Sequence, residues 1–184
     1  MKSILLSIKP KYVELIARGE KTIEVRKTAP KEVPFKAYIY CTKEKKQDDI
    51  IWAGIFGDRG KWNGRVIGEF ICDNVERFEE HIEKGGLYYI LSDTFNEQAQ
   101  LDNWELHDYG KGKTIYGWHI SDLKIYDKPK ELGDFKKHCH YKDRNSYCLA
   151  NECEYYSDWT GICCNWVERP PQSWCYVKDL GEEE

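Results

Sequence analysis

Four residues near the start of the chain have side chains suited to holding an anion or a polar ring. Lys9 stands directly before a proline, and Lys21, Glu24 and Arg26 lie in the run Glu-Lys-Thr-Ile-Glu-Val-Arg-Lys at positions 20–27. A guanidinium can bind a phosphate or a base edge through two parallel hydrogen bonds, and an ammonium acts there as a point charge. A carboxylate can also serve as a general base. The pattern predicts a ligand site, in which Lys21 and Glu24 are the catalytic candidates if the chain is an enzyme.

The alternating pattern of residues 20–27 also permits a purely structural role for the same side chains. Glu24 and Arg26 fall on one face of a strand, close enough to form a surface ion pair. Strict alternation puts Lys21 on the opposite face, so a shared site requires a twist or bulge after Gly19. The sequence leaves both interpretations open.

Two further ligand-binding candidates, Trp118 and His119, are adjacent in the second half of the chain. An indole ring can stack on an unpaired base, which is worth about 1–3 kcal/mol per base. Recognition of exposed RNA bases generally combines such rings with cations. The alternatives are a core position for Trp118 and a partly buried structural role for His119.

Cysteines are concentrated at the other end of the chain, where six of the eight fall between positions 139 and 175. Thiolates and imidazoles are the ligands that zinc prefers, and four of them complete a structural site. The candidate ligands of a structural zinc are Cys139, Cys148, Cys153 and Cys163. Because the sequence has no Cys-x-x-Cys pair, reduced thiols and disulfides remain alternatives.

Charge is unevenly distributed along the 184 residues. Residues 1–46 carry twelve Lys or Arg against five Glu, a balance of +7, whereas the remainder has a balance of −11. A basic region on an acidic body can hold an anionic ligand, because the local field decides docking; scattered surface charge is the alternative. No segment is long and apolar enough to cross a membrane, and the first apolar run ends at Ile8 without a cleavage site. We therefore expect a cytoplasmic protein.

The elements that position these residues are short. Aromatic residues make up 14% of the chain and there is a single Met, which favours strands over a helical bundle. Strands are predicted over residues 3–8, 20–27, 36–42, 65–73 and 114–125, and helices over residues 10–18 and 92–109. Residues 50–56 are ambiguous, residues 74–85 should continue the sheet and then become irregular or helical, and residues 174–177 should add a strand or pack on the rest. These elements predict an α+β fold, a small mixed β-barrel with two or three short helices.

Several stretches together resemble the ASCH domain family, a branch of the PUA-like fold, and in particular its short phage and bacterial members. The stretches that carry the resemblance are Leu5–Pro10, Gly19–Lys27, Tyr109–Lys113, Tyr116–Leu123 and Arg169–Tyr176. The resemblance covers roughly residues 1–130. We therefore predict an ASCH-like barrel domain over residues 1–130 and a Cys-rich extension over residues 131–184 that packs on it.

The resemblance implies a basic cleft between the first helix and the strands that binds RNA or a modified nucleotide. The residues it assigns to this cleft are Lys9, Lys21, Glu24 and Arg26, with Trp118 or His119 nearby. Some relatives remove an acetyl group from acetylcytidine with a lysine that matches Lys21 and activates a threonine, but Glu24 occupies that threonine position here. Other relatives have been assigned ribonuclease activity, for which a base and a cation suffice. We predict binding of RNA or a modified nucleotide without catalysis; an RNA-directed hydrolase and a protein-interaction module are the alternatives.

Overall fold

A computed structural model describes the chain over residues 1–43, 62–83, 86–89, 91–92, 94–137, 156–157, 162–163 and 165–181. Its largest sheet has five strands in the order β12-β1-β3-β4-β9. These strands are β1 (Lys2–Ile8), β3 (Phe35–Cys41), β4 (Val66–Cys72), β9 (Ser121–Lys130) and β12 (Trp174–Val177). The β1–β3 pair is parallel and the other pairs are antiparallel. Parallel neighbours need a crossover connection, which the helix α1 and the strand β2 provide here.

The crossover begins with α1 (Pro10–Ala17), whose first residue is a proline with no N–H to leave unpaired. Val13 and Ile16 are fully buried and pack with the strands of the large sheet. The helix ends just before Gly19, which has a φ of +75° that other residues rarely adopt. The chain therefore turns sharply there and enters the next strand.

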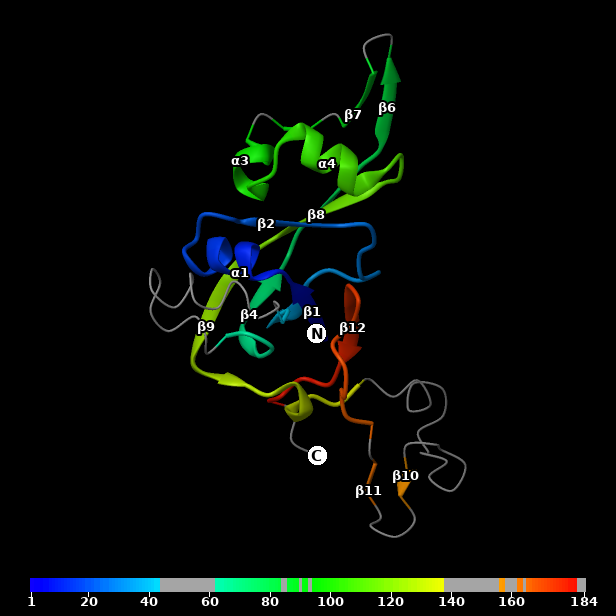
Figure 1. Cartoon of the computed structure of the whole chain (residues 1–184). Helices are drawn as coiled ribbons and strands as arrows, with labels where there is room; N and C mark the ends of the chain where they lie inside the picture. The colour runs from blue at the N-terminus through cyan, green and yellow to red at the C-terminus, as the bar shows by residue number, and fades with distance from the viewer. Residues whose placement is uncertain are drawn as a thin grey trace.

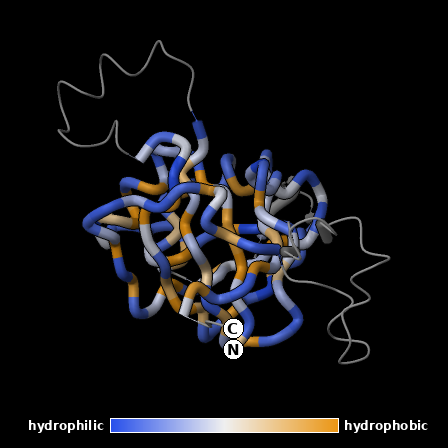
Figure 2. Tube along the Cα trace, turned by 90° about the horizontal axis from the view of Figure 1, so that it is seen from below, coloured by the Kyte–Doolittle hydropathy of each residue, from blue (hydrophilic) through white to orange (hydrophobic). Residues whose placement is uncertain are grey.

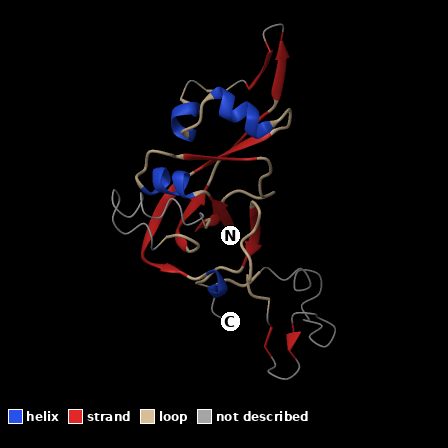
Figure 3. Cartoon of the chain, viewed as in Figure 1, coloured by secondary structure: helices blue, strands red, loops and turns tan. Residues whose placement is uncertain are grey.

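A second sheet has three antiparallel strands in the order β2-β8-β5. They are β2 (Ile23–Arg26), β8 (Ile115–His119) and β5 (Val75–Phe78). The helices α3 (Phe95–Ala99) and α4 (Asn103–Gly110) lie on one side of β2 and β8, and α1 lies on the other (Figures 1 and 3). All four residues of β2 are therefore buried, the charged ones included.

Smaller elements complete the described part of the chain. The hairpin strands β6 (Glu80–Glu83) and β7 (Gly86–Tyr89) project beyond α4 in Figure 1. The strands β10 (Tyr156–Ser157) and β11 (Ile162–Cys163) pair with each other, and η2 (Leu132–Asp134) is one 3₁₀ turn after β9. No helix in the described residues is long and apolar enough to span a membrane.

The apolar residues form three clusters, one on each face of the large sheet and one beneath α3 and α4. Ile4 and Leu6 face the cluster that contains α1, whereas Leu5 faces the opposite one. Because both faces of β1 are covered, its sequence is an almost continuous apolar run. Figure 2 shows hydrophobic and hydrophilic residues interleaved along the tube, as expected when apolar positions come from many short elements.

The predicted α+β class is confirmed, and most predicted elements are present. Two predictions are wrong in detail. The single helix expected over residues 92–109 is two helices, because Gln100 adopts a left-handed conformation that ends α3. The strand expected over residues 114–125 is two strands, which belong to different sheets. Residues 74–85 contain two strands where an irregular or helical stretch was also expected, and residues 50–56 lie outside the described residues.

The C-terminal residues are joined to the first strand of the chain. β12 pairs with β1, from Ser3 opposite Val177 to Leu6 opposite Trp174, so the strand predicted there is confirmed. The proposed boundary after residue 130 stays a prediction.

Candidate functional site

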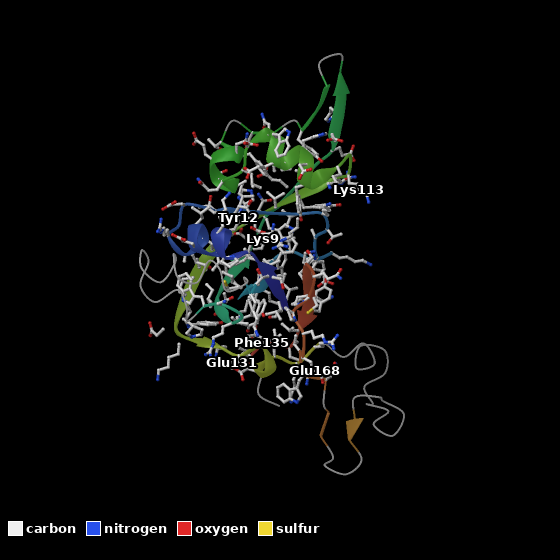
Figure 4. All side chains as sticks on the ribbon, in the orientation of Figure 1. Lys9, Tyr12, Lys113, Glu131, Phe135 and Glu168 are labelled. Carbon is white, nitrogen blue, oxygen red and sulfur yellow. The ribbon has the colours of Figure 1, made fainter. Side chains whose placement is uncertain are left out.

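A cavity of about 810 Å³ lies between α1, β2, α4 and the segment that precedes β12. Small-molecule sites commonly have volumes of about 300–1,000 Å³. Lys9 and Tyr12 contribute from the α1 side, and both lie near the middle of the molecule, below α4, in Figure 4. The remaining walls come from segments far apart in the sequence, so the cavity exists only in the folded chain.

The floor of the cavity is a buried charged group that we call the triad: Lys21, Glu24 and Arg26. Lys21 Nζ lies 3.5 Å from one Glu24 carboxylate oxygen, and Arg26 Nη2 lies 2.8 Å from the other. Lys21 also donates a hydrogen bond to the Ala99 carbonyl, and Arg26 donates one of 2.7 Å to the Ser7 carbonyl. The exposed fractions of the triad side chains are 1%, 7% and 10%. The ion pair anticipated between Glu24 and Arg26 is present, but it is buried at a cavity rather than exposed on a surface.

The turn after α1 explains why Lys21 joins Glu24 despite the alternation of the run. The backbone N–H of Gly19 bonds to the Ile16 carbonyl, and that of Lys21 bonds to the Leu15 carbonyl, so the chain coils back before β2 begins at residue 23. Lys21 therefore precedes the regular strand and is not bound by its alternation. The twist after Gly19 that a shared site requires is present.

Burial dominates the electrostatics of the triad. Burial lowers the pKa of Lys21, an effect that the attraction of Glu24 opposes only in part and that the nearby Arg26 charge reinforces. The Nε atom of Arg26 is buried and has no hydrogen-bond partner among the described residues. Leaving a buried donor unpaired costs about 1–3 kcal/mol. The floor thus combines an ammonium group whose pKa is lowered, that of Lys21, with a guanidinium donor that lacks a hydrogen-bond partner among the described residues, that of Arg26.

Aromatic side chains form the walls above the triad. Trp104 stands on α4 with 72% of its surface exposed, and Tyr109 follows on the same helix. Across the cavity, the ring of Tyr12 lies 5.2 Å from Lys21 Nζ. Burial raises the pKa of the Tyr12 hydroxyl, and the charges of Glu105 and Glu24 raise it further, so this residue stays neutral at physiological pH.

The helix that carries Trp104 is held by its own N-terminus. Asp102 accepts a hydrogen bond of 2.7 Å from the Glu105 N–H, and Glu105 accepts one of 3.0 Å from the Asp102 N–H. This capping box satisfies two N–H groups that a helix end would leave unpaired. Glu105 also pairs with Lys11 of α1 at 3.7 Å. Trp104 is therefore presented to solvent by a fixed helix.

The C-terminal segment closes the remaining side through residues 170–173. The Ser7 hydroxyl donates to the Pro171 carbonyl at 2.7 Å, and the Ser7 N–H donates to the Ser173 carbonyl at 2.9 Å. The Trp174 indole N–H donates to the Thr28 hydroxyl at 3.0 Å. The run Arg169–Tyr176, which contributed to the family resemblance, thus contains part of the cavity wall.

Comparison with known proteins shows which family has this architecture. The model of the ASCH domain family matches residues 6–159, most of the chain. The chain belongs to the ASCH domain family. The predicted membership is therefore confirmed.

Solved structures with the same fold are ASCH proteins from Zymomonas mobilis. The crystal structure of the ASCH protein is 16% identical with a TM-score of 0.53, over 96% of this chain and 88% of that chain. A tyrosine-to-phenylalanine mutant of the Zymomonas protein gives 16% identity and a TM-score of 0.54, over 97% and 91%. At this identity the likeness shows the fold alone. A comparison with curated proteins finds no match.

Four of the six predicted ligand-binding residues line one cavity of this ASCH domain. They are Lys9, Lys21, Glu24 and Arg26. The cavity lining as a whole is not strongly basic, because the carboxylates of Glu105 and Asp108 face these cations from α4.

The other two candidates lie elsewhere. Trp118 is fully buried and makes edge-on ring contacts with Phe35 at 5.1 Å and Trp174 at 6.0 Å. It offers no free face for stacking, because both neighbours are part of the core packing. His119 lies outside the cavity lining, with its Nε2 atom 2.6 Å from the Glu76 carboxylate. The structural alternatives for these two residues are the ones observed.

Sequence reasoning missed the aromatic wall and the C-terminal segment. The ligand-binding candidates drawn from the sequence include neither Tyr12 nor Trp104. The available signal was the spacing of Trp104, which lies two positions before Leu106, a buried residue of the same helix. Residues two apart on a helix do not share a face, so a tryptophan at that spacing is directed away from the core.

The predicted zinc ligands cannot be placed in this structure. Cys139, Cys148 and Cys153 lie outside the described residues, and the side chain of Cys163 is not described. Within the ranges that are described, no group of three or more metal-ligating side chains occurs, and Cys72 and Cys175 are free thiols. Structural zinc stays a prediction.

Proposed function

We propose that this ASCH domain binds single-stranded RNA, or a modified nucleotide, by taking one unpaired base into the cavity above the triad. The observation that carries the proposal is the exposed Trp104 at a cavity with a buried charged floor. The ring of Trp104 is 72% exposed on a well-capped helix, so one of its faces is accessible to a ligand. Every base has a flat face on which such a ring can stack.

The floor supplies the hydrogen-bonding groups that a base edge needs. Glu24 can accept from an exocyclic amino group, and Arg26, whose buried Nε has no hydrogen-bond partner among the described residues, can donate to a keto oxygen. These groups are at least nine-tenths buried, so bonds to them form with little competition from water. The ASCH family is generally linked to RNA binding or hydrolase-like function, which supports a nucleic-acid ligand.

Hydrolysis of RNA by the same residues is the second candidate, because Lys21 has a lowered pKa and lies 3.5 Å from a carboxylate. A lysine of lowered pKa beside a carboxylate is an arrangement that enzymes use for proton transfer. Binding accounts better for the geometry: Lys21 is 1% exposed and already donates to the Ala99 carbonyl, which leaves little access for a reacting atom.

Fluorescence anisotropy of a labelled short single-stranded RNA tests the proposal. The variant is Trp104→Ala, and the matched control is Trp166→Ala, an exposed tryptophan outside the cavity. Loss of one stacked base should weaken binding by about 1–3 kcal/mol, or roughly 5- to 150-fold in Kd, and the control should bind like wild type. A duplex of the same sequence should bind less well, since its bases are paired.

Equal affinities of Trp104→Ala and wild type would sink the proposal. Mass analysis of the RNA recovered from the titration separates the two candidates. Unchanged RNA supports binding, whereas shortened or deacetylated RNA that Lys21→Met no longer produces would establish the hydrolase.

A further inference from the structure

We infer that the cavity takes an internal nucleotide of an RNA strand, and that Lys9 and Lys27 hold the phosphates on its two sides. This inference rests on the proposed function and adds the class of ligand: a nucleotide flanked by two phosphodiesters rather than a free nucleoside. It also assigns a binding role to Lys27.

Two of the three carboxylates that line the cavity, those of Glu24 and Glu105, are paired with cations of the protein. Glu24 is paired with both cations of the triad. Glu105 is paired with Lys11 at 3.7 Å and accepts the Asp102 N–H in the capping box. Carboxylates in such pairs repel a phosphate less than free carboxylates do. The paired carboxylates therefore do not prevent an anion from binding at the mouth of the cavity.

Lys9 and Lys27 are both exposed. Lys9 lines the cavity and is the residue immediately before α1. Lys27 follows the triad residue Arg26 directly, and its Nζ lies 5.0 Å from the centre of the Tyr109 ring, which lines the cavity. A hydrogen bond also joins Tyr109 to the Lys27 backbone. Across the described ranges, neither lysine side chain forms an ion pair, so both ammonium groups are available to a ligand.

The start of α1 strengthens the Lys9 end. The first turn of this eight-residue helix contains no acidic side chain and its N-terminus has no side-chain cap. The positive end of the helix dipole therefore acts together with the ammonium of Lys9 on an incoming anion.

The total charge fits two phosphodiesters. The cavity lining holds three cationic side chains, Lys9, Lys21 and Arg26, and three carboxylates, Glu24, Glu105 and Asp108. Lys11 and Lys27, which contact lining residues, add two positive formal charges beside it. A free nucleoside would leave this charge uncompensated, whereas an internal nucleotide brings one negative charge on each side.

Isothermal titration calorimetry with uridine, uridine 3′-monophosphate and the trinucleoside diphosphate UpUpU tests the size of the ligand. Affinity should rise along this series, and it should fall back toward that of uridine when both linkages of UpUpU are uncharged methylphosphonates. If uridine binds as tightly as UpUpU, the inference is wrong although the proposed function stands. If none of these ligands nor a longer single strand binds, the proposed function itself fails.

Lysine variants test the two named contacts with an oligouridylate across a salt series. For single strands, each phosphate contact contributes about −0.7 to the slope of log K against log salt concentration. Lys9→Ala and Lys27→Ala should each make the slope less negative by about 0.7, and the double variant by about 1.4. Lys128→Ala, on β9 outside the cavity, is the control and should leave the slope unchanged. Slopes for Lys9→Ala and Lys27→Ala equal to that of the control would overturn the assignment.

Discussion

The strongest prediction for the stability of the chain concerns Glu24, because its carboxylate is the single negative charge of the triad. Glu24→Gln preserves the shape of the side chain but leaves Lys21 and Arg26 buried without their counter-charge. Removing one partner of a buried ion pair typically destabilises a protein by about 3–5 kcal/mol. For a chain of this length that corresponds to a fall in Tm of roughly 6–20 °C.

Lys21→Met should be the milder change. It leaves the 2.8 Å pair between Glu24 and Arg26 intact and removes an ammonium that burial disfavours. Its main cost is the unpaired Ala99 carbonyl, about 1–3 kcal/mol. Urea and thermal unfolding monitored by circular dichroism give both values. The control Glu32→Gln removes an exposed pair with Lys2 and should change the free energy of unfolding by about 1 kcal/mol or less.

The pH dependence adds a second readout. In Glu24→Gln, burial and Arg26 act on the pKa of Lys21 without opposition from Glu24, and only the charge of Glu105 still raises it, so the pKa should fall further below the ordinary value of 10.5. Between the folded and unfolded pKa values the unfolded chain binds more protons, and stability therefore rises with pH. The stability of the variant should therefore rise with pH over a wider range below 10.5 than that of wild type. A Glu24→Gln protein that unfolds within about 1 kcal/mol of wild type would refute the account of the triad, because the expected penalty is about 3–5 kcal/mol.

Two further predictions concern the scaffold. Burial alone would raise the pKa of Asp179, but hydrogen bonds from Lys36, the Gly181 backbone and Ser3 outweigh it and lower the pKa to about 2. This lowered pKa contributes about 2 kcal/mol of stability above pH 4, and the contribution is lost as pH falls toward 2. In an acid titration monitored by circular dichroism, Asp179→Asn should not show this loss of stability, whereas wild type should. Gly117→Ala would place a Cβ 2.7 Å from the Phe95 ring and should destabilise the chain by about 1–3 kcal/mol in urea unfolding. The control Gly133→Ala, whose Cβ would meet no atom within 4 Å, should not destabilise it. Similar urea midpoints for the two variants would contradict this packing.

The elements around the N-terminal half of the site were predictable because local rules agree there. The apolar run of residues 3–8 and Pro10 at the start of a helix each indicate one structure, which is observed. The alternation of residues 20–27 indicates a half-buried strand; a strand is observed over residues 23–26 only, and all four of its residues are buried. The turn after α1, which the alternation does not predict, brings Lys21 to the same cavity as Lys9, Glu24 and Arg26. The closure of a barrel stays a prediction, since the strands are described as separate sheets.

The remaining parts of the site depend on contacts between distant segments. Nothing local to Pro171 or Ser173 indicates that these residues meet Ser7, because their hydrogen bonds span more than 160 positions. Trp118 shows the opposite problem. Its indole ring suits a stacking surface, and only the packing of Phe35 and Trp174 against the ring shows that Trp118 belongs to the core. Long-range packing overrides local pattern in both cases.

The most direct test of the central claim is cross-linking of RNA that contains 4-thiouridine to the intact protein, followed by mass analysis of the modified peptides. A base held above the triad lies against Tyr12, Trp104 and Tyr109, so cross-links should fall in the peptides from α1 and α4. Cross-links confined to aromatic residues outside the cavity, such as Trp166 or Tyr126, would contradict it.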